Sequence, residues 1–222
     1  MTGAAGLIGT AVAPLLSGLW DLQLTDRAPG VGTVLDVCDP RACAAAFAGS
    51  DAVIHLAGVP HPDASWDSLY PANVLGAYQV AQAAIDCGVR RLVLASSVQV
   101  VAGYPNTVQR RASDPPLPLN LYGATKAWGE ALGAWVAATS ATSVVALRLG
   151  FFAEQPPPGE DLRAMWLSPR DCAQLLRRAV EVEDIRFLIA NGVSANRHLI
   201  ADLSATTARL GYKPVDDAWA DC

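Results

Sequence analysis

Short apolar runs alternate with longer stretches of helical periodicity along most of the chain. The apolar runs are rich in β-branched residues and poor in charge, which is typical of strands buried on both faces. We expect strands at 22–25, 33–37, 52–56, 91–95, 144–149 and 186–190. We expect helices at 7–16, 40–47, 68–87, 121–139 and 169–182, and a last one that ends at Gly211. Strands that alternate with helices predict an α/β fold built on a doubly wound parallel sheet.

The composition narrows the class of protein and its partners. A chain of 222 residues, 52% hydrophobic and 17% charged, is typical of a globular domain with a substantial core. The net charge of -5 argues against nucleic acid or an anionic membrane as a partner, and no apolar run is long enough to span a bilayer. Five cysteines without a Cys-x-x-Cys pair indicate a reducing, cytoplasmic location, and the scattered histidines predict no metal site.

The chain opens with the glycine-rich stretch MTGAAGLIG. Gly3 is expected to make a tight turn, Gly6 to let a pyrophosphate approach, and Gly9 to let the following helix pack closely. The first helical amides, near Leu7 and Ile8, would point at the phosphates. The loop therefore predicts a dinucleotide cradle, although an ordinary glycine-rich helix start has the same composition.

Such a loop normally follows a buried strand, and here only Met1 and Thr2 precede Gly3. We expect that strand to be central in the sheet, with later strands on both sides. Two residues cannot fill the position, so we expect the natural start to lie upstream, with an apolar segment ending just before Thr2. Without it the sheet would have an unfilled slot with exposed ladder groups.

Further residues at strand ends are candidates for the same cofactor site. Asp26 ends a strand about twenty residues after the loop, where a carboxylate accepts hydrogen bonds from a ribose diol and repels a 2′-phosphate. NAD is therefore favoured over NADP, although the adjacent Arg27 leaves room for NADP. Asp36 and Val37 could reach the adenine, or Asp36 could be a solvated strand-end acid. Backbone contacts are expected from Leu56, Ala57, Gly58 and Ala95, whereas His55 is interpreted as a hydrogen-bonded core residue.

The chemistry is predicted from two further motifs. Tyr122 and Lys126 are four residues apart and share one face of a helix, and Ser96 and Ser97 end a strand at the carboxyl edge of the sheet. A serine, a tyrosine and a lysine there can transfer a proton beside a nicotinamide. A phenolate at neutral pH needs a tyrosine pKa lowered by roughly three units, which we expect the lysine to provide.

Together these motifs resemble the short-chain dehydrogenase/reductase superfamily, in its extended branch of NAD-dependent epimerases and dehydratases. The similar stretches are TGAAGLIG, HLAG, NVLGAY, LASS, YGATK and LRLG. The resemblance implies a Rossmann-type fold, with Ser97, Tyr122 and Lys126 as the catalytic set and Asn73 supporting the cofactor site. Within this branch ASSVQVVAGYP and EDLRAMWLSPRD are most similar to uronate dehydrogenases, which oxidise a hexuronate at its anomeric carbon and pass the hydride to NAD.

That family also implies a substrate site. Arg163 matches the arginine expected to bind the substrate carboxylate, and Ser96, Ser97 and Gln99 are the other expected substrate contacts. The chain departs from the family at several positions where polar groups are expected, namely Val98, Gln99, Phe151 and Pro60. Lost polar partners weaken the binding of a hydroxylated ligand.

We therefore expect an NAD-dependent oxidoreductase that takes hydride from a small sugar acid, lactol or related alcohol. The alternatives are a nucleotide-sugar epimerase or dehydratase and a non-catalytic NAD-binding sensor. The proline-rich QPPPGED stretch at 155–161 suggests a cofactor region at 1–150, which includes the catalytic residues, and a small substrate region at 151–222. Helices 68–87 and 121–139 are the expected homodimer surface, with Trp128 and Trp135 either in that interface or in the core.

Overall fold

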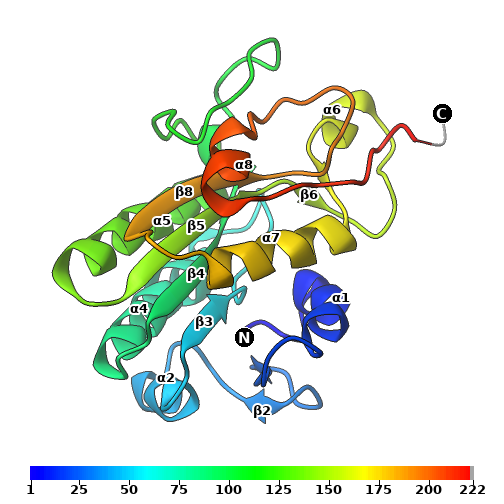
Figure 1. Cartoon of the computed structure of the whole chain (residues 1–222). Coiled ribbons are helices and arrows are strands. Elements are labelled where there is room, and N and C mark those ends of the chain that lie inside the picture. Colours follow the sequence, from blue (N-terminus) through cyan, green and yellow to red (C-terminus); the bar gives the residue numbers. More distant parts are fainter. Residues whose placement is uncertain (221–222) are drawn as a thin grey trace.

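The computed structural model describes residues 1–220 and has the expected α/β architecture (Figure 1). Its main sheet is wholly parallel, in the order β3-β4-β5-β8. These strands are β3 (Ala52–His55), β4 (Arg91–Ser97), β5 (Ser143–Leu149) and β8 (Phe187–Gly192). A second parallel pair, β1 (Thr25–Asp26) and β2 (Thr33–Val34), lies beyond β3. The predicted parallel sheet of the Rossmann type is confirmed.

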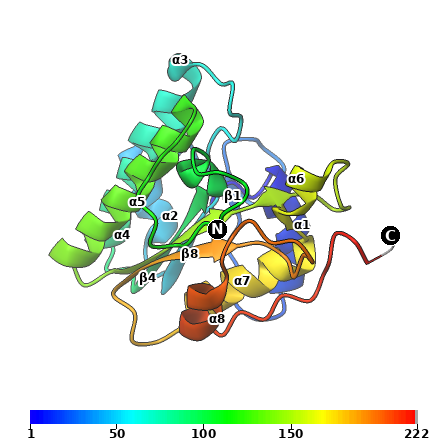
Figure 2. The same ribbon diagram turned by 90° about the horizontal axis from the view of Figure 1, so that it is seen from above.

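Helices cover both faces of this sheet (Figure 2). One core, between the sheet and α2, α4 and α5, is built around Val80, Leu92 and Val136. The other, between the sheet and α1, α7 and α8, includes Leu16 and Leu176. The bounds are α1 (Leu7–Leu16), α2 (Pro40–Phe47), α4 (Gly76–Asp86), α5 (Leu121–Thr139), α7 (Pro169–Glu181) and α8 (Ser204–Leu210).

The predicted helix at 68–87 is divided in the structure. It consists of α3 (Trp66–Leu69), a π-helical turn η1 (Tyr70–Leu75) and α4. Pro71 lies in the first turn of η1 and lacks an amide hydrogen, so an uninterrupted hydrogen-bond ladder cannot pass through it. The wider turn carries Asn73, whose buried side chain belongs to the site described below.

The two expected strands nearest the N-terminus are shorter than predicted. The run at 22–25 enters a ladder only at Thr25, and the run at 33–37 pairs only at Thr33 and Val34. A strand is defined by continuous pairing with a neighbour, and β1 and β2 pair at only two positions, Thr25 with Thr33 and Asp26 with Val34. Sequence propensity alone cannot predict the lengths of these two strands.

The N-terminal residues occupy the centre of the sheet, as expected. Thr2 forms parallel bridges with both Thr25 and His55, so it lies between β1 and β3. Its amide donates to the Ile54 carbonyl at 2.9 Å, and its carbonyl accepts from the Leu56 amide at 3.2 Å. Thr2 therefore occupies the position between β1 and β3.

The C-terminal part of the chain forms a group of short elements beyond the main sheet and also adds a strand and a helix to the sheet layers. Three short elements, α6 (Glu160–Arg163), β6 (Phe151–Phe152) and β7 (Trp166–Leu167), lie beyond the carboxyl edge of the main sheet (Figure 1). The following α7 and β8 return to the sheet, where β8 pairs with β5. Ser168 caps α7 by accepting the Asp171 amide, as its Ser-Pro start predicts. Within residues 1–220, the helices are all too short or too polar to cross a membrane.

Candidate functional site

The glycine loop has backbone geometry that only glycine tolerates at two of its positions. Gly3 has φ +73°, and a Cβ there would lie 2.5 Å from the Ala57 amide nitrogen. A Cβ on Gly9 would lie 2.4 Å from the Gly3 carbonyl oxygen, so Gly9 lets α1 pack onto the loop itself. At Gly6 the nearest atom would be 3.2 Å away. The expected turn at Gly3 is confirmed.

The start of α1 is suited to an anion. Its N-cap, Gly6, is extended and provides no side chain to accept the first helical amides. Leu7 and Ile8 lie in the first turn of α1, where the amides have no carbonyl of the same helix to donate to. They remain donors at the positive end of the helix dipole. This arrangement fits the pyrophosphate of a dinucleotide.

Asp26 lies directly beside this loop. Its two carboxylate oxygens accept hydrogen bonds from the amides of Ala5 and Ala28, each at 2.9 Å. Each oxygen keeps a second lone pair, so the carboxylate can still accept from a ribose hydroxyl. Arg27 is exposed beside it, and at the end of β2 the exposed Asp36 accepts from the Cys38 amide while Val37 packs against Gly76.

The segment after β3 is connected to α5 through hydrogen bonds of Asn73. Asn73 accepts from the Val59 amide at 2.7 Å and donates to the Val59 carbonyl and to Thr125, each at 3.1 Å. These bonds fix the backbone of Leu56 to Gly58 beside the glycine loop. A Cβ on Gly58 would lie 3.0 Å from the Asn73 Oδ1 and 3.7 Å from the Lys126 Nζ. Asn73 therefore links the predicted cofactor loop to α5.

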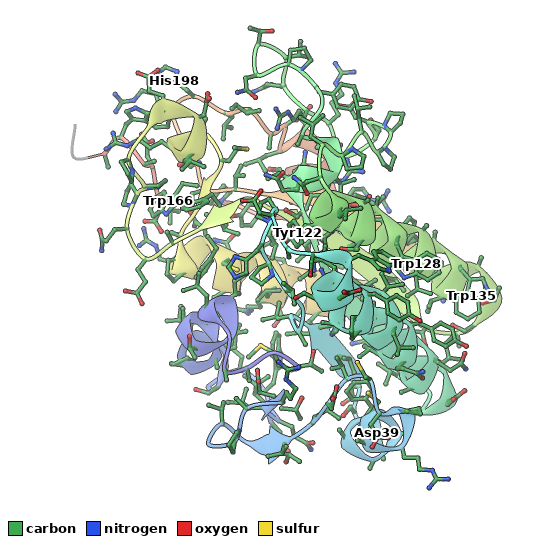
Figure 3. The ribbon with its side chains drawn as sticks, turned by 180° about the vertical axis from the view of Figure 1, so that it is seen from behind. Asp39, Tyr122, Trp128, Trp135, Trp166 and His198 are labelled. Atoms are coloured by element: carbon green, nitrogen blue, oxygen red, sulfur yellow. The ribbon has the colours of Figure 1, made fainter. Side chains whose placement is uncertain are left out.

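The three predicted catalytic residues meet at the carboxyl end of β4. Ser97 ends this strand, and its side chain hydrogen-bonds the phenol of Tyr122 in the first turn of α5. The Lys126 Nζ lies 5.7 Å from the centre of the Tyr122 ring and donates to the Ala95 carbonyl at 2.8 Å. Figure 3 shows Tyr122 at the end of α5 that faces the centre of the molecule. The arrangement can hold a hydroxyl oxygen and accept its proton.

Burial changes the acidity of both α5 groups. Desolvation lowers the pKa of Lys126 to about 8. Desolvation also raises the pKa of Tyr122, and the hydrogen bond with Ser97 opposes it. This direction differs from the expected lowering, because the ammonium donates to the Ala95 carbonyl and lies beside the ring rather than at the phenol oxygen.

A buried network that sequence analysis missed supports this cluster. Glu130 accepts from Arg148 through both carboxylate oxygens, at 2.8 and 2.9 Å, and from the Ser96 hydroxyl at 2.6 Å. Arg148 also donates to the carbonyls of Arg111 and Asp114 in the segment before α5. The sequence did contain an indication of this network, since Glu130 follows Lys126 by four residues on the same helix face. The network ties α5 to β4 and β5.

The expected substrate contacts are only partly brought together. The Ser96 hydroxyl donates to Glu130 and so belongs to the buried network. Gln99 accepts from Asn120 at 2.9 Å and keeps its amide nitrogen as a donor. Arg163 lies in α6, where its Nε donates to the Pro157 carbonyl at 3.0 Å. Val98 is buried next to Ser97, whereas Pro60 and Phe151 are exposed.

His55 is a core residue, as interpreted from the sequence. It is buried, and its Nδ1 lies 2.8 Å from the Thr2 hydroxyl oxygen. Desolvation, with a smaller effect of Lys126, lowers its pKa to about 3. The ring is therefore neutral in the folded protein at physiological pH.

Comparisons with known proteins show what the whole chain is similar to. A model of the NAD dependent epimerase/dehydratase family matches residues 1–161. The chain is 38% identical to an L-arabinose 1-dehydrogenase (NAD(P)(+)) of Haloferax volcanii, over 98% of this chain and 96% of that protein. It is 36% identical to an NAD-dependent glucose-6-phosphate dehydrogenase of the same organism, over 98% and 93%. A uronate dehydrogenase mutant from Agrobacterium tumefaciens, solved in complex with NAD, superposes with a TM-score of 0.92 at 28% identity, over 99% and 84% of the two chains.

The buried ion pair gives a first prediction. Glu130→Ala leaves the Arg148 guanidinium buried without its carboxylate, so we expect the free energy of unfolding in urea to fall by about 3–5 kcal/mol. The double variant Glu130→Leu with Arg148→Met should be more stable than that single variant. Glu181→Ala, which breaks an exposed helical pair with Arg177, is the matched control and should cost less than about 1 kcal/mol. A loss as small for Glu130→Ala as for Glu181→Ala would contradict this account.

The buried histidine gives a second prediction, on pH. The pKa of His55 is about 3 when folded and about 6.5 when unfolded, so the unfolded chain binds an extra proton in this window. Stability contributed by the neutral ring is present above about pH 6.5 and is lost as the pH falls. Between about pH 6 and pH 5, His55→Asn should reduce the pH slope of the unfolding free energy by up to about 1.4 kcal/mol per unit. His198→Asn, on the surface, is the control, and equal slopes for the wild type and His55→Asn would refute the assignment.

Proposed function

Because the chain belongs to the NAD dependent epimerase/dehydratase family and is an NAD-dependent oxidoreductase, we propose that it oxidises the anomeric hydroxyl of a small free sugar. The reaction converts the cyclic sugar and NAD⁺ to a lactone, NADH and a proton. One observation carries the proposal, namely the meeting of Ser97, Tyr122 and Lys126 at the carboxyl end of β4, beside the glycine loop.

Each of the three residues has a distinct role. The Ser97 hydroxyl holds the reacting oxygen at a fixed distance from Tyr122, and the tyrosine oxygen accepts the hydroxyl proton. Lys126 holds the nicotinamide ribose. NAD, when bound, supplies the acceptor for the hydride that leaves the anomeric carbon. The glycine loop and Asp26 hold the pyrophosphate and the adenosine ribose, and Asn73 keeps the loop after β3 in place.

The substrate is proposed to be a neutral aldose rather than a hexuronate. Val98, Phe151 and Pro60 are apolar at positions where a uronate site would present polar groups. The relative of 38% identity is named for arabinose, a neutral aldose, which supports the same choice. Residues 151–222, with Arg163, are proposed to form the substrate side of the pocket. In this role the guanidinium group of Arg163 donates hydrogen bonds to sugar oxygen atoms remote from the anomeric carbon.

The chain is also proposed to form a homodimer in a reducing, cytoplasmic environment. Trp128 and Trp135 are each 43% exposed on the outer side of α5 (Figure 3), which supports a second copy there over a place in the core. Tyr78 on α4 is exposed as well. The described cysteines, Cys38, Cys43, Cys87 and Cys172, are all free thiols, and Cys222 lies outside the described residues.

A third prediction tests the chemistry. Tyr122→Phe removes the proton acceptor but keeps the ring, so we expect kcat to fall by about 10²–10⁴-fold with an unchanged Tm. NADH absorbance measures turnover, and isothermal titration with NAD checks that the cofactor still binds. Tyr78→Phe, on the exposed side of α4, is the matched control. Undiminished turnover by Tyr122→Phe would exclude the mechanism.

A fourth prediction tests the substrate class. We expect kcat/KM for neutral aldoses to exceed that for hexuronates by about 10-fold or more, since each missing polar partner costs roughly 1–3 kcal/mol. A panel of aldoses, aldose phosphates and hexuronates, each followed by NADH absorbance, gives the comparison. Hexuronates as the best substrates would overturn the choice of a neutral sugar. Isomerised nucleotide sugars without net NADH would identify an epimerase instead.

A further inference from the structure

Two side-chain amides form a hydrogen-bonded pair beside Ser97 and Tyr122. Gln99 belongs to the short turn η2 (Val98–Val101), which follows β4, and its backbone amide donates to the Ser97 hydroxyl oxygen at 3.2 Å. Asn120 is the N-cap of α5 and precedes Tyr122 by two residues. The Asn120 Nδ2 donates to the Gln99 Oε1 at 2.9 Å. The pair therefore connects the two segments that carry Ser97 and Tyr122.

The backbone of α5 determines which atom of Asn120 faces Gln99. The Gly123 amide lies in the first turn of α5, where no carbonyl of the same helix is available to it. The Asn120 side chain accepts from this amide at 2.8 Å, and only the oxygen of a side-chain amide can accept. The atom of Asn120 that contacts Gln99 is consequently the nitrogen, which is a donor.

The same reasoning fixes the orientation of Gln99. The atom that contacts the Asn120 nitrogen must be an acceptor, so it is the Gln99 oxygen, and the Gln99 Nε2 faces away from Asn120. Within residues 1–220, no protein group accepts a hydrogen bond from this nitrogen, and the side chain is only partly buried. Gln99 therefore presents a donor, and not an acceptor, close to Ser97.

The capping of α5 does not by itself require an asparagine. Aspartate and serine cap helices about as well, because each has an oxygen that accepts an amide of the first turn. The Asn120 nitrogen is not needed for the cap, and its hydrogen bond goes to Gln99. Close packing supports this contact, since a Cβ on Gly123 would lie 2.6 Å from the Gln99 carbonyl oxygen. The nitrogen of Asn120 thus has a separate role, which is to orient Gln99.

Building on the proposed sugar oxidation, we infer that Asn120 is a positioning residue that orients Gln99 so that its Nε2 donates to an acceptor oxygen of the substrate. In that reaction Ser97 and Tyr122 hold the anomeric hydroxyl. The two oxygens nearest to this hydroxyl, the ring oxygen and the 2-hydroxyl, both have lone pairs that accept a hydrogen bond. A substrate without an acceptor at this place leaves the Gln99 donor unpaired, which weakens its binding.

Two substitutions of Asn120 test the inference, because both keep the cap of α5. Asn120→Asp still accepts from Gly123 but presents a carboxylate oxygen to Gln99, so the Gln99 amide turns and donates to it. The Gln99 oxygen, and not its nitrogen, then meets the substrate. Asn120→Ser is the matched control, since its shorter side chain caps the helix and leaves Gln99 without a fixed orientation. We expect Tm to stay within about 2 °C of the wild type for both variants.

The first measurement uses the free protein and needs no substrate. Hydrogen exchange of the Gln99 side-chain NH₂ group, followed by NMR, should slow by about 10-fold or more in Asn120→Asp, because the charged carboxylate then binds that group. Exchange should remain fast in the wild type and in Asn120→Ser. The signals are assigned by their absence in Gln99→Met. Exchange that is already slow in the wild type, or that is unchanged in Asn120→Asp, would overturn the inference.

The second measurement is turnover of the best sugar, followed by NADH absorbance. Asn120→Asp should raise KM by about 10-fold or more and leave kcat within about 3-fold, because Gln99 binds the substrate away from the reacting oxygen. Asn120→Ser should raise KM less. A loss in kcat alone, or an equal rise in KM for both variants, would mean that Asn120 has only a structural role.

A 2-deoxy sugar identifies the oxygen that accepts from Gln99. The effect of Asn120→Asp on KM should persist with this sugar if the ring oxygen accepts, and it should disappear if the 2-hydroxyl accepts. Turnover of no sugar by the wild type would refute the proposed function, whereas the exchange measurement would still decide the orientation of Gln99. The two failures are therefore distinguishable.

Discussion

The buried contact of Glu130 with Arg148 and Ser96 determines how the rest of the site is assembled. It joins the catalytic helix to two strands, and it does so with side chains that are 3% and 1% exposed in the ion pair. Two charges removed from water are tolerated only where their hydrogen bonds are nearly complete, and this pair has a bidentate contact plus a serine donor. The helix therefore has one position relative to the sheet. Tyr122 and Lys126 precede Glu130 on the same face, and Ser97 follows Ser96, so the pair also positions the groups that we propose to react.

The parallel sheet separates two regions with different chemistry. At its carboxyl edge the strands end in loops whose backbone is held by Asn73 and by the turn at Gly3, and there the proposed cofactor and substrate contacts lie. Between β1 and β3, Met1 and Thr2 pair with both neighbouring segments. Thr2 connects the two regions, because it bridges β1 and β3 and also contacts His55 below the glycine loop.

Much of this structure could be predicted from the sequence, for physical reasons. The helices α1, α2 and α5 have the expected bounds, since glycine, proline and asparagine starts and clear helical periodicity define them. Ser97, Tyr122 and Lys126 could be placed together because parallel strands end at one edge and four residues make about one helical turn. The glycine turn follows from a positive φ that other residues resist.

Other features depend on contacts that no local pattern contains. The length of β1 is set by its pairing with β2 at two positions, and the side chain of Asn73, carried by the π-helical turn at Tyr70–Leu75, bonds to Val59 and Thr125. An arginine is unusual in a buried strand, and the position of Arg148 is explained only by its contact with Glu130. The pKa of Tyr122 depends mainly on how deeply the phenol is buried, which spacing alone does not give. A crystal structure of the protein soaked with NAD tests the central claim most directly. The account predicts pyrophosphate at the Leu7 and Ile8 amides, with the nicotinamide beside Ser97, Tyr122 and Lys126. NAD bound elsewhere, or these three side chains far apart, would contradict it.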